Sequence, residues 1–576
     1  MSIQRKLLAY LSNVIHFKDI NVKEALLASS DINPDGTREI TYAEAENNSI
    51  TGAILKAAVN PNNNNTDIVS FDELQFFKNI ATLAANTFSG CTNLKSVRFP
   101  NATCLNGTTI YNILHNTAVE ELHLEGISYL QSGSIQQTDS NSKFGVMNSL
   151  KIIYITSLTK HTGYCFAGSH IPNLEKCVIS SIDQWLYMDI TGMNGSRPYA
   201  SGKASMYLAS DLNTPISDVT TATQALSGVT TVPTIFDYMF YNLNYGTING
   251  VRHLTTITIG ADNTEAKAGA FMNVSSAVTI YNIEKITKIG SRAFDGCMAV
   301  GLTNIPPVQI IPDYAFRNSS LQKAVRDTVT SINGINCFTN TPITEVELNY
   351  LTSITGGGTF SSCKSLTTVS LDRLTSATGP GTGIFSSCTA LTTVSLAAAT
   401  TIYGNMFYQC VALTTVNAPN AVIIQIEAFN NCSLLTNAGI TINFSNCTHI
   451  YERAFNSCSR LNAPVNYTNL QYIGWAAFTG CIAPSGKYVI FGYTGGIVHY
   501  EPGHGFGSEE YYHKLNCFGG NNANEYINTI YVPDGNLTID GVTKTYVEWY
   551  EADSEWALML QYNPSLNILP VSQLPT

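Results

Sequence analysis

Residues 360–371 (FSSCKSLTTVSL) and residues 385–396 (FSSCTALTTVSL) are near copies of one another, and they decide the fold. Each begins with F-x-x-C and continues with an alternation of apolar residues with Thr and Ser. The phenylalanine recurs in ten successive units, at intervals of 23, 22, 22, 22, 25, 22, 22, 26 and 23 residues: Phe271, Phe294, Phe316, Phe338, Phe360, Phe385, Phe407, Phe429, Phe455 and Phe478. A period of about 22 to 23 residues is typical of leucine-rich repeats.

The apolar alternation in each unit predicts one short strand per repeat. In residues 366–371, for example, Leu366, Val369 and Leu371 would point inward, while Thr and Ser fill the outward positions. Strands stacked roughly 4.8 Å apart would form a parallel β ladder around one continuous core. The fold class is therefore a repeat solenoid with little helix, in which the Phe and Cys side chains are core rungs.

The cysteines favour burial over disulfide bonding. F-x-x-C recurs from Phe88 and Cys91 to Phe478 and Cys481, and no C-x-x-C pair occurs. Equivalent side chains on stacked rungs point in parallel, so bridging them would require the backbone to leave the repeat geometry. We therefore expect each cysteine to act as a small buried hydrophobic side chain.

Weaker copies of the unit, around Phe144, Phe166 and Phe240, extend the array to about fifteen repeats. The open ends of a ladder expose core side chains and unpaired strand edges, so caps are required. The expected division is an N-terminal helical capping segment with Leu26 and Leu27 as plugs (1–75), repeats (76–180), an insertion or degenerate repeat dividing the array (181–232), repeats (233–485) and a C-terminal cap with Trp549 and Trp556 (486–576).

Composition excludes two classes of partner. Charged residues make up 12% of the chain, the formal net charge is −11, and no basic stripe suits nucleic acid or an anionic membrane. No apolar run has the length of a membrane span. The stretch from Met1 to Ser30 contains no uninterrupted apolar segment of the kind that a signal peptide has. We therefore expect no membrane insertion and no export by the general secretory route.

The repeat carries a family resemblance. TFSGCTNLKSVRFP at 87–100 and AFNSCSRL at 454–461 resemble the A-F-x-x-C-x-x-L unit of BspA-like leucine-rich repeats. The flanks FKDINVKEALL and IYVPDGNLTIDGVTKTYVEWYEADSEW similarly resemble the two ends of such proteins. Family members are typically surface proteins of anaerobic bacteria and some protists, and related repeats occur in phages. The resemblance implies adhesion or host contact.

A phage particle is assembled in the host cytoplasm and needs no signal peptide. We therefore predict a virion-associated adhesin, such as a tail or appendage protein, that contacts a host surface protein, a host glycan or other virion proteins. A fibre or appendage is commonly multimeric, so this prediction includes a homo-oligomer. The alternatives are a bacterial cell-surface adhesin and, more remotely, a glycan-active enzyme.

The outward face of the strand ladder is the predicted binding surface, because a long curved solenoid face suits an extended partner. Its candidate residues are Ser96, Arg98, Glu121, His123, Thr256, Thr258, Glu345, Glu347, Thr368, Ser370, Thr393 and Ser395. Thr is also favoured at exposed strand positions by β-propensity alone. Both interpretations stay open for each residue.

A stretch near the N-terminus, DINPDGTREITYAE at 31–44, begins like an EF-hand calcium loop. The candidate ligands are Asp31, Asn33, Asp35, Glu39 and Glu44. The twelfth loop position is Tyr42 where an EF-hand has Glu, so Glu39 or Glu44 would have to close the shell. We favour a turn in which the Asp side chains satisfy backbone donors, with structural calcium as the alternative and no other cofactor.

Catalysis has little support in the sequence. H-E-x-x-H, G-x-S-x-G and P-loop motifs are absent, and the His- and Glu-rich segment 499–513 matches no zinc spacing. Glu345 and Glu347 alternate on one strand and so share an exposed face. Two acids suit glycoside hydrolysis in principle. A solvated pair is the favoured interpretation, and we predict that the protein is not an enzyme.

Overall fold

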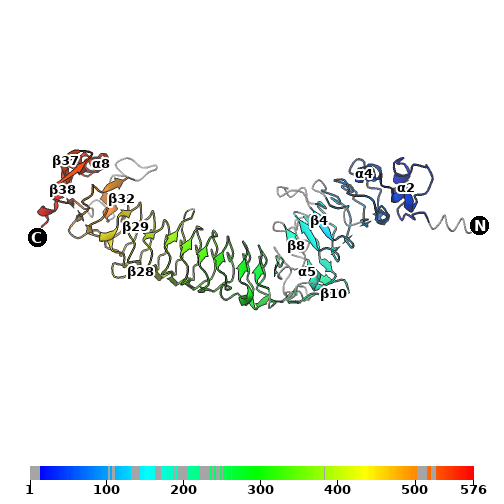
Figure 1. The fold of residues 1–576 in the computed structure, drawn as a ribbon, viewed down its shortest axis with the longest axis horizontal. Coiled ribbons are helices and arrows are strands. Elements are labelled where there is room, and N and C mark those ends of the chain that lie inside the picture. Colours follow the sequence, from blue (N-terminus) through cyan, green and yellow to red (C-terminus); the bar gives the residue numbers. More distant parts are fainter. Residues whose placement is uncertain are drawn as a thin grey trace, which may run out of the picture. The chain divides into compact units, whose positions relative to one another are not determined.

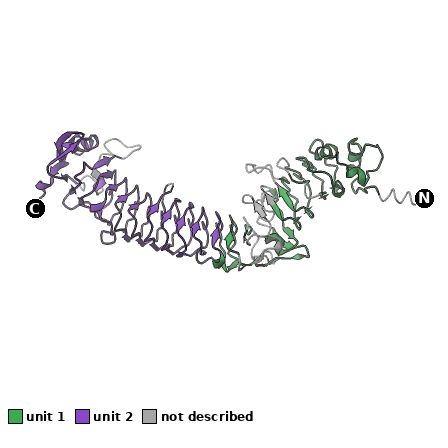
Figure 2. Cartoon of the chain, in the orientation of Figure 1, with its two compact units in different colours: residues 1–285, 297–301 green, residues 286–296, 302–576 purple. Residues whose placement is uncertain are grey.

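The computed structural model describes residues 13–100, 104–106, 111–131, 143–162, 170–186, 189–191, 204–220, 234–235, 239–241, 247–248, 251–252, 254–260, 263–379, 381, 383–502, 515–519 and 527–575. These residues belong to two compact units, which Figure 2 colours separately. Unit 1 contains residues 1–285 and 297–301, and unit 2 contains residues 286–296 and 302–576. The division lies C-terminal to segment 181–232.

Unit 2 is a parallel β-solenoid in which most repeats contribute two short strands. The longer strand of each repeat belongs to a sheet that we call the first ladder: β20 (Lys323–Val325), β22 (Glu345–Glu347), β24 (Thr368–Ser370), β26 (Thr393–Ser395) and β28 (Thr415–Asn417). Every pair in this ladder is parallel, and Val346, Val369, Val394 and Val416 are in register. Figure 1 shows the repeats of unit 2 as successive rungs and labels β28 among these strands.

The other strand of each repeat belongs to the second ladder of unit 2. Its first sheet contains β19 (Ile310–Ile311), β21 (Ser331–Ile332), β23 (Ser353–Ile354) and β25 (Ser376–Ala377), and its next contains β27 (Thr401–Ile402), β29 (Ile423–Ile424), β30 (His449–Ile450), β32 (Tyr472–Gly474) and β34 (His499–Glu501). Towards the C-terminus a further parallel sheet is formed by β31 (Asn466–Tyr467), β33 (Tyr488–Phe491), β35 (Thr529–Val532) and β38 (Asn567–Pro570).

Unit 1 has the same parallel arrangement with less regular spacing. Its first ladder contains β3 (Glu121–His123), β5 (Ile152–Tyr154), β7 (Lys176–Ile179) and β9 (Ser205–Leu208), with β10 (Asp211–Pro215) antiparallel at the edge. Separate sheets are formed by β1 (Ser70–Phe71) with β2 (Ser96–Val97), by β4 (Tyr129–Gln131), β6 (Lys160–Thr162) and β8 (Asp189–Thr191), and by β11 (Asp218–Thr220), β15 (Thr256–Thr258) and β17 (Thr279–Tyr281).

The phenylalanines of the repeat form one continuous stack in the core of unit 2. From Phe294 to Phe478, successive ring centroids are 4.7 to 5.7 Å apart and the ring planes differ by at most 18°. These distances follow the spacing of neighbouring strands. The prediction that each Phe is a core rung is confirmed; the weak copy at Phe166 lies outside the described residues.

The cysteines are buried and free throughout the described residues; Cys165 lies outside them. Beyond filling space, six of the thiols each donate a hydrogen bond to the phenylalanine carbonyl of the preceding repeat: Cys363, Cys388, Cys410, Cys432, Cys458 and Cys481. The Sγ atoms of Cys388 and Cys410, for example, are each 3.1 Å from the carbonyl oxygens of Phe360 and Phe385. The recurrence of Cys is therefore explained by this hydrogen bond as well as by the small size of the side chain.

Each regular repeat has two left-handed residues, which lie two positions before and two positions after the phenylalanine. Around Phe338 these are Asn336 (φ 50°) and Asn340 (φ 59°), and around Phe360 they are Gly358 (φ 65°) and Ser362 (φ 60°). Asn and Gly adopt this conformation at the lowest cost. The turns explain why these residue types recur beside the F-x-x-C motif.

The N-terminal end of the solenoid is covered by short helices, α2 (Ile20–Leu27), α3 (Tyr42–Ala45) and α4 (Gly52–Val59). Leu26 is fully buried, whereas Leu27 is half-buried, so only Leu26 is a complete plug. The Asp19 side chain caps α2 and also accepts hydrogen bonds from the backbone of Val69 and Ser70, which ties the helix to β1.

The C-terminal end is covered by α7 (Tyr546–Ala552) and α8 (Ser554–Tyr562). Trp556 is fully buried, and its Nε1 donates to the Val498 carbonyl at 2.7 Å. Trp549 donates to the Leu537 carbonyl at 2.8 Å. Within the described residues, every helix is too short or too polar to cross a bilayer.

Candidate binding surface on the first ladder

The register of unit 2 places two rows of side chains, all polar except Val325, on the outward face of the first ladder. The central residue of each strand is buried, so the residues on either side of it face outward. The first row is Lys323, Glu345, Thr368, Thr393 and Thr415, and the second is Val325, Glu347, Ser370, Ser395 and Asn417. The six candidate residues that lie in unit 2 therefore share one surface.

The two threonines of each LTTV unit have different roles. The first lies before the strand, and its hydroxyl donates to a carbonyl one repeat earlier: Thr367 to Thr344, Thr392 to Thr367 and Thr414 to Thr392, at 3.0 to 3.1 Å. The second is Thr368, Thr393 or Thr415. These residues are exposed, and their hydroxyls have no hydrogen-bond partner among the described residues. The second threonines therefore present a row of available hydroxyls.

The acidic end of this surface is held by neighbouring side chains. Glu345 is 3.3 Å from the Lys323 ammonium group. The Asn349 amide donates to Glu347 and to Asp327, each at 3.1 Å. Both glutamates thus have electrostatic or hydrogen-bonding partners on the face, as expected for a solvated surface pair.

In unit 1 the candidate residues Arg98, Glu121 and His123 come together. Arg98 pairs with His123 across a parallel bridge. The His123 ring lies between two acids, with Nδ1 3.0 Å from Glu125 and Nε2 3.6 Å from Glu121. It also stacks on Tyr154, with ring centroids 4.3 Å apart and planes 8° apart.

Tyr154 extends this group, and Lys176 lies two strands from Glu121 in the same row of the ladder; the sequence reasoning missed both. Burial, with a contribution from Glu121, raises the pKa of the Tyr154 hydroxyl, so the hydroxyl remains a donor. The Lys176 ammonium donates to the Leu212 carbonyl at 2.7 Å and lies 4.9 Å from the ring centroid of Tyr207. The available signal was the outward position of each strand, but the irregular spacing in unit 1 hides the register.

The three remaining candidates lie apart from these groups. Ser96 donates its hydroxyl to Asp72, which also binds Lys18 at 2.7 Å, so Ser96 belongs to the junction with the N-terminal helices. Thr256 and Thr258 lie on β15, in register with Thr279 and Tyr281 of β17. The twelve candidates therefore divide between unit 1 and unit 2.

The residues of the EF-hand-like stretch 31–44 mostly bind other groups of the protein. The Asn33 amide donates to the carbonyls of Leu27 and Thr37, each at 3.1 Å, and Asp35 accepts from the Thr37 amide at 3.0 Å. Glu39 pairs with Lys23 at 2.8 Å. Glu44 forms a capping box with Thr41 at the start of α3.

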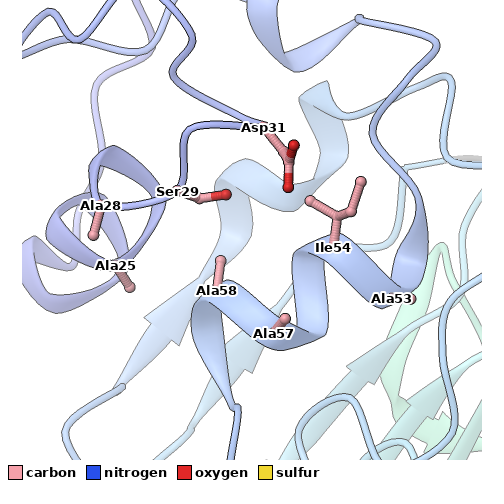
Figure 3. A pocket seen from close by; sticks show the side chains of 8 residues that line it. All are labelled: Ala25, Ala28, Ser29, Asp31, Ala53, Ile54, Ala57 and Ala58. Carbon is pink, nitrogen blue, oxygen red and sulfur yellow. The ribbon is translucent and has the colours of Figure 1, made fainter.

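Asp31 lies apart from these contacts, at a depression of about 460 Å³ between α2 and α4. Figure 3 shows its carboxylate directed towards the helix that carries Ile54. Within the part of the chain that the structure describes, His, Cys, Asp and Glu side chains nowhere gather in threes as a metal site. Calcium binding remains a prediction. The histidines and acids of segment 503–513 lie outside the described residues.

Comparisons with known proteins agree with the repeat. The model of the "BspA type Leucine rich repeat region (6 copies)" matches residues 64–193, 221–322, 309–436 and 384–486, more than half of the chain. Comparison with curated proteins gave no match.

Similar solved structures include leucine-rich-repeat proteins from Bacteroides ovatus (17% identity, 71% of this chain and 82% of that one, TM-score 0.39) and Eubacterium ventriosum (16%, 63% and 83%, TM-score 0.36). A leucine-rich cell surface protein from Faecalibacterium prausnitzii is 17% identical over 55% of this chain and 86% of its own, with a TM-score of 0.31. On the strength of the repeat model, this chain belongs to the BspA-type leucine-rich-repeat family.

Proposed function

We propose that the chain is a non-enzymatic adhesin whose first ladder in unit 2 binds an extended surface protein or glycan. The observation that carries the proposal is the row of Thr368, Thr393 and Thr415, whose exposed hydroxyls repeat in register on consecutive strands and lack partners among the described residues. A partner with a repeating structure can form the same weak polar contact with each rung. Solenoid proteins use extended faces in this way.

We propose that the chain is displayed on a phage particle; display on a bacterial envelope is the alternative. Mass spectrometry of purified particles and of cell envelopes from the source culture distinguishes the two carriers. Recovery of the polypeptide with the particles supports a tail or appendage role. Recovery with the envelopes alone rules out the virion assignment and leaves a bacterial adhesin.

The binding face is tested with two bulky, charged substitutions on the row, Thr368→Arg and Thr393→Arg together. The matched control is Thr328→Arg with Thr378→Arg, which changes two exposed threonines outside the strands by the same chemistry. Binding of fluorescently labelled protein to cells from the source culture is measured by flow cytometry. We expect the row variant to bind at least tenfold more weakly and the control to bind like the wild type. Equal binding by all three proteins would refute the proposal.

A further inference from the structure

The second ladder of unit 2 ends in an aromatic surface distinct from the first-ladder face. Ile450, Ile473 and Tyr500 are fully buried at the matching position of three consecutive rungs. Their chain neighbours on either side therefore occupy the outward positions, and all of them except the buried Gly474 are at least partly exposed. These neighbours form three pairs: His449 with Tyr451, Tyr472 with Gly474, and His499 with Glu501. We call the four rings His449, Tyr451, Tyr472 and His499 the aromatic patch.

The rings of the aromatic patch form a continuous row across the rungs. The centroid of Tyr472 lies 5.8 Å from His449, 5.5 Å from His499 and 4.7 Å from Tyr451. His499 is exposed, and the other three rings are half-buried. A row of partly exposed rings on a sheet offers π faces to a partner that lies along the ladder.

His449 uses one polar edge, because its Nδ1 lies 3.0 Å from the Thr448 hydroxyl, but the polar edges of the other three rings are not used within the described residues. The hydroxyls of Tyr451 and Tyr472 and the ring nitrogens of His499 have no hydrogen-bond partner there. Structural tyrosines of the same unit differ: the Tyr550 hydroxyl accepts from the Val498 amide, and the Tyr546 hydroxyl donates to the Thr494 carbonyl, both at 2.8 Å. The patch therefore retains donors and acceptors for a ligand.

The composition of the six outward positions restricts the partner. They include no aliphatic side chain, no Lys and no Arg, and Glu501 is their only carboxylate. Gly474 cannot carry a side chain, because a Cβ would lie 2.3 Å from the Glu452 backbone nitrogen. No side chain therefore separates Tyr451 from Glu501 in the outward row.

We propose that the aromatic patch is a glycan-binding site for neutral sugars. The C–H face of a sugar ring carries a small positive charge that complements the π faces of Tyr451 and Tyr472. Sugar hydroxyls need convergent donors and acceptors, which the tyrosine hydroxyls and the Glu501 carboxylate supply. A protein partner would be expected to bring apolar anchors, for which the patch offers no aliphatic pocket. A negatively charged sugar is disfavoured by Glu501.

The test applies the full-length chain to an immobilised array of neutral and acidic oligosaccharides, followed by isothermal titration calorimetry with the strongest neutral binder. Tyr472→Ala should weaken binding by about tenfold or more, which corresponds to about 1.4 kcal/mol. Tyr472→Phe keeps the ring face and should lose only about threefold, consistent with one neutral hydrogen bond. His499→Ala, at the exposed edge, should lose an intermediate amount. The control is Tyr350→Ala, because Tyr350 is 47% exposed elsewhere in unit 2.

Three results would overturn the proposal: the array retains none of the protein, Tyr472→Ala and Tyr350→Ala weaken binding equally, or only acidic sugars bind. A fourth assigns the patch to a protein partner: cell binding that depends on Tyr472 but survives periodate oxidation of the cell-surface glycans. The site lies on the other ladder, so it does not rest on the proposed function. The variant with Thr328→Arg and Thr378→Arg, which lies outside both proposed sites, should leave array binding unchanged.

Discussion

Truncation of one ring in the phenylalanine stack should open the solenoid locally. Phe407 is fully buried, and its ring centroid is 5.7 Å from that of Phe385 and 5.3 Å from that of Phe429. Phe407→Ala removes the ring and leaves a cavity, which costs about 3–5 kcal/mol in protein cores. Phe407→Leu retains most of the volume and loses chiefly two stacked contacts, each worth about 0.5–1.5 kcal/mol. The expected losses are therefore about 3–5 kcal/mol for Ala and about 1–3 kcal/mol for Leu.

Hydrogen exchange measured by mass spectrometry is the appropriate assay, because repeat proteins lose structure between nearest neighbours rather than everywhere at once. We expect faster amide exchange in the repeats that contain Phe385, Phe407 and Phe429, and unchanged exchange in α7 and α8. Alanine should have a larger effect than leucine. A loss of local stability below about 1 kcal/mol for Phe407→Ala, or equal effects of the two variants, would show that the phenylalanine stack does not stabilise the core.

Three further predictions concern the buried thiols, the EF-hand-like loop and the glycine turns. Burial raises the pKa of Cys91 to about 11 and of Cys410 to about 12, above the ordinary thiol value near 9. The stability that these neutral thiols contribute should therefore be complete below pH 9 and fall as pH rises through 11 to 12. A melting temperature that stays constant from pH 8 to 11 contradicts this. Glu44→Ala should destabilise the N-terminal helices by about 0.5–2 kcal/mol through the lost capping box, equally in calcium and in EDTA. A calcium-dependent rise in melting temperature that this variant abolishes would instead establish a metal site. Gly356→Ala should prevent local folding, measured by limited proteolysis, because its Cβ would lie 1.8 Å from the Gly334 carbonyl oxygen. The control Gly381→Ala, with open space around its Cβ, should cost only about 1–2 kcal/mol for its left-handed backbone. Equal proteolysis of the two variants contradicts the steric argument.

The first ladder of unit 2 could be predicted from sequence because its spacing is nearly constant. A valine flanked by Thr and Ser at a period of about 22 residues specifies the strand, its inward face and its register together. The interval from Phe360 to Phe385 is longer than those on either side of it, yet the additional residues fall between strands, and Val369 and Val394 remain paired. The outward positions of these rungs were therefore identified correctly.

The surface of unit 1 could not be predicted in the same way. Glu121 pairs with Ile152 and Ile152 pairs with Lys176, so the first of these two successive intervals is clearly the longer. Such variable loops hide the register, so the stacking of His123 on Tyr154 is apparent only in three dimensions. The aromatic patch was hidden for a similar reason, because its strands are very short and its rings alternate between His and Tyr.

The recurrent residues and the exceptional ones carry different information. In the repeats that contain Cys363, Cys388 and Cys410, the Cys thiol and the first Thr hydroxyl both donate to carbonyls of the preceding repeat, so their recurrence follows from the need to join rungs. A requirement repeated at every rung cannot distinguish one partner from another. Specificity must come from outward positions where the side chain departs from the repeat, such as His123, Tyr472 and Glu345. Exchanging those positions between family members should therefore transfer binding preference, whereas exchanging the first threonines should change only stability.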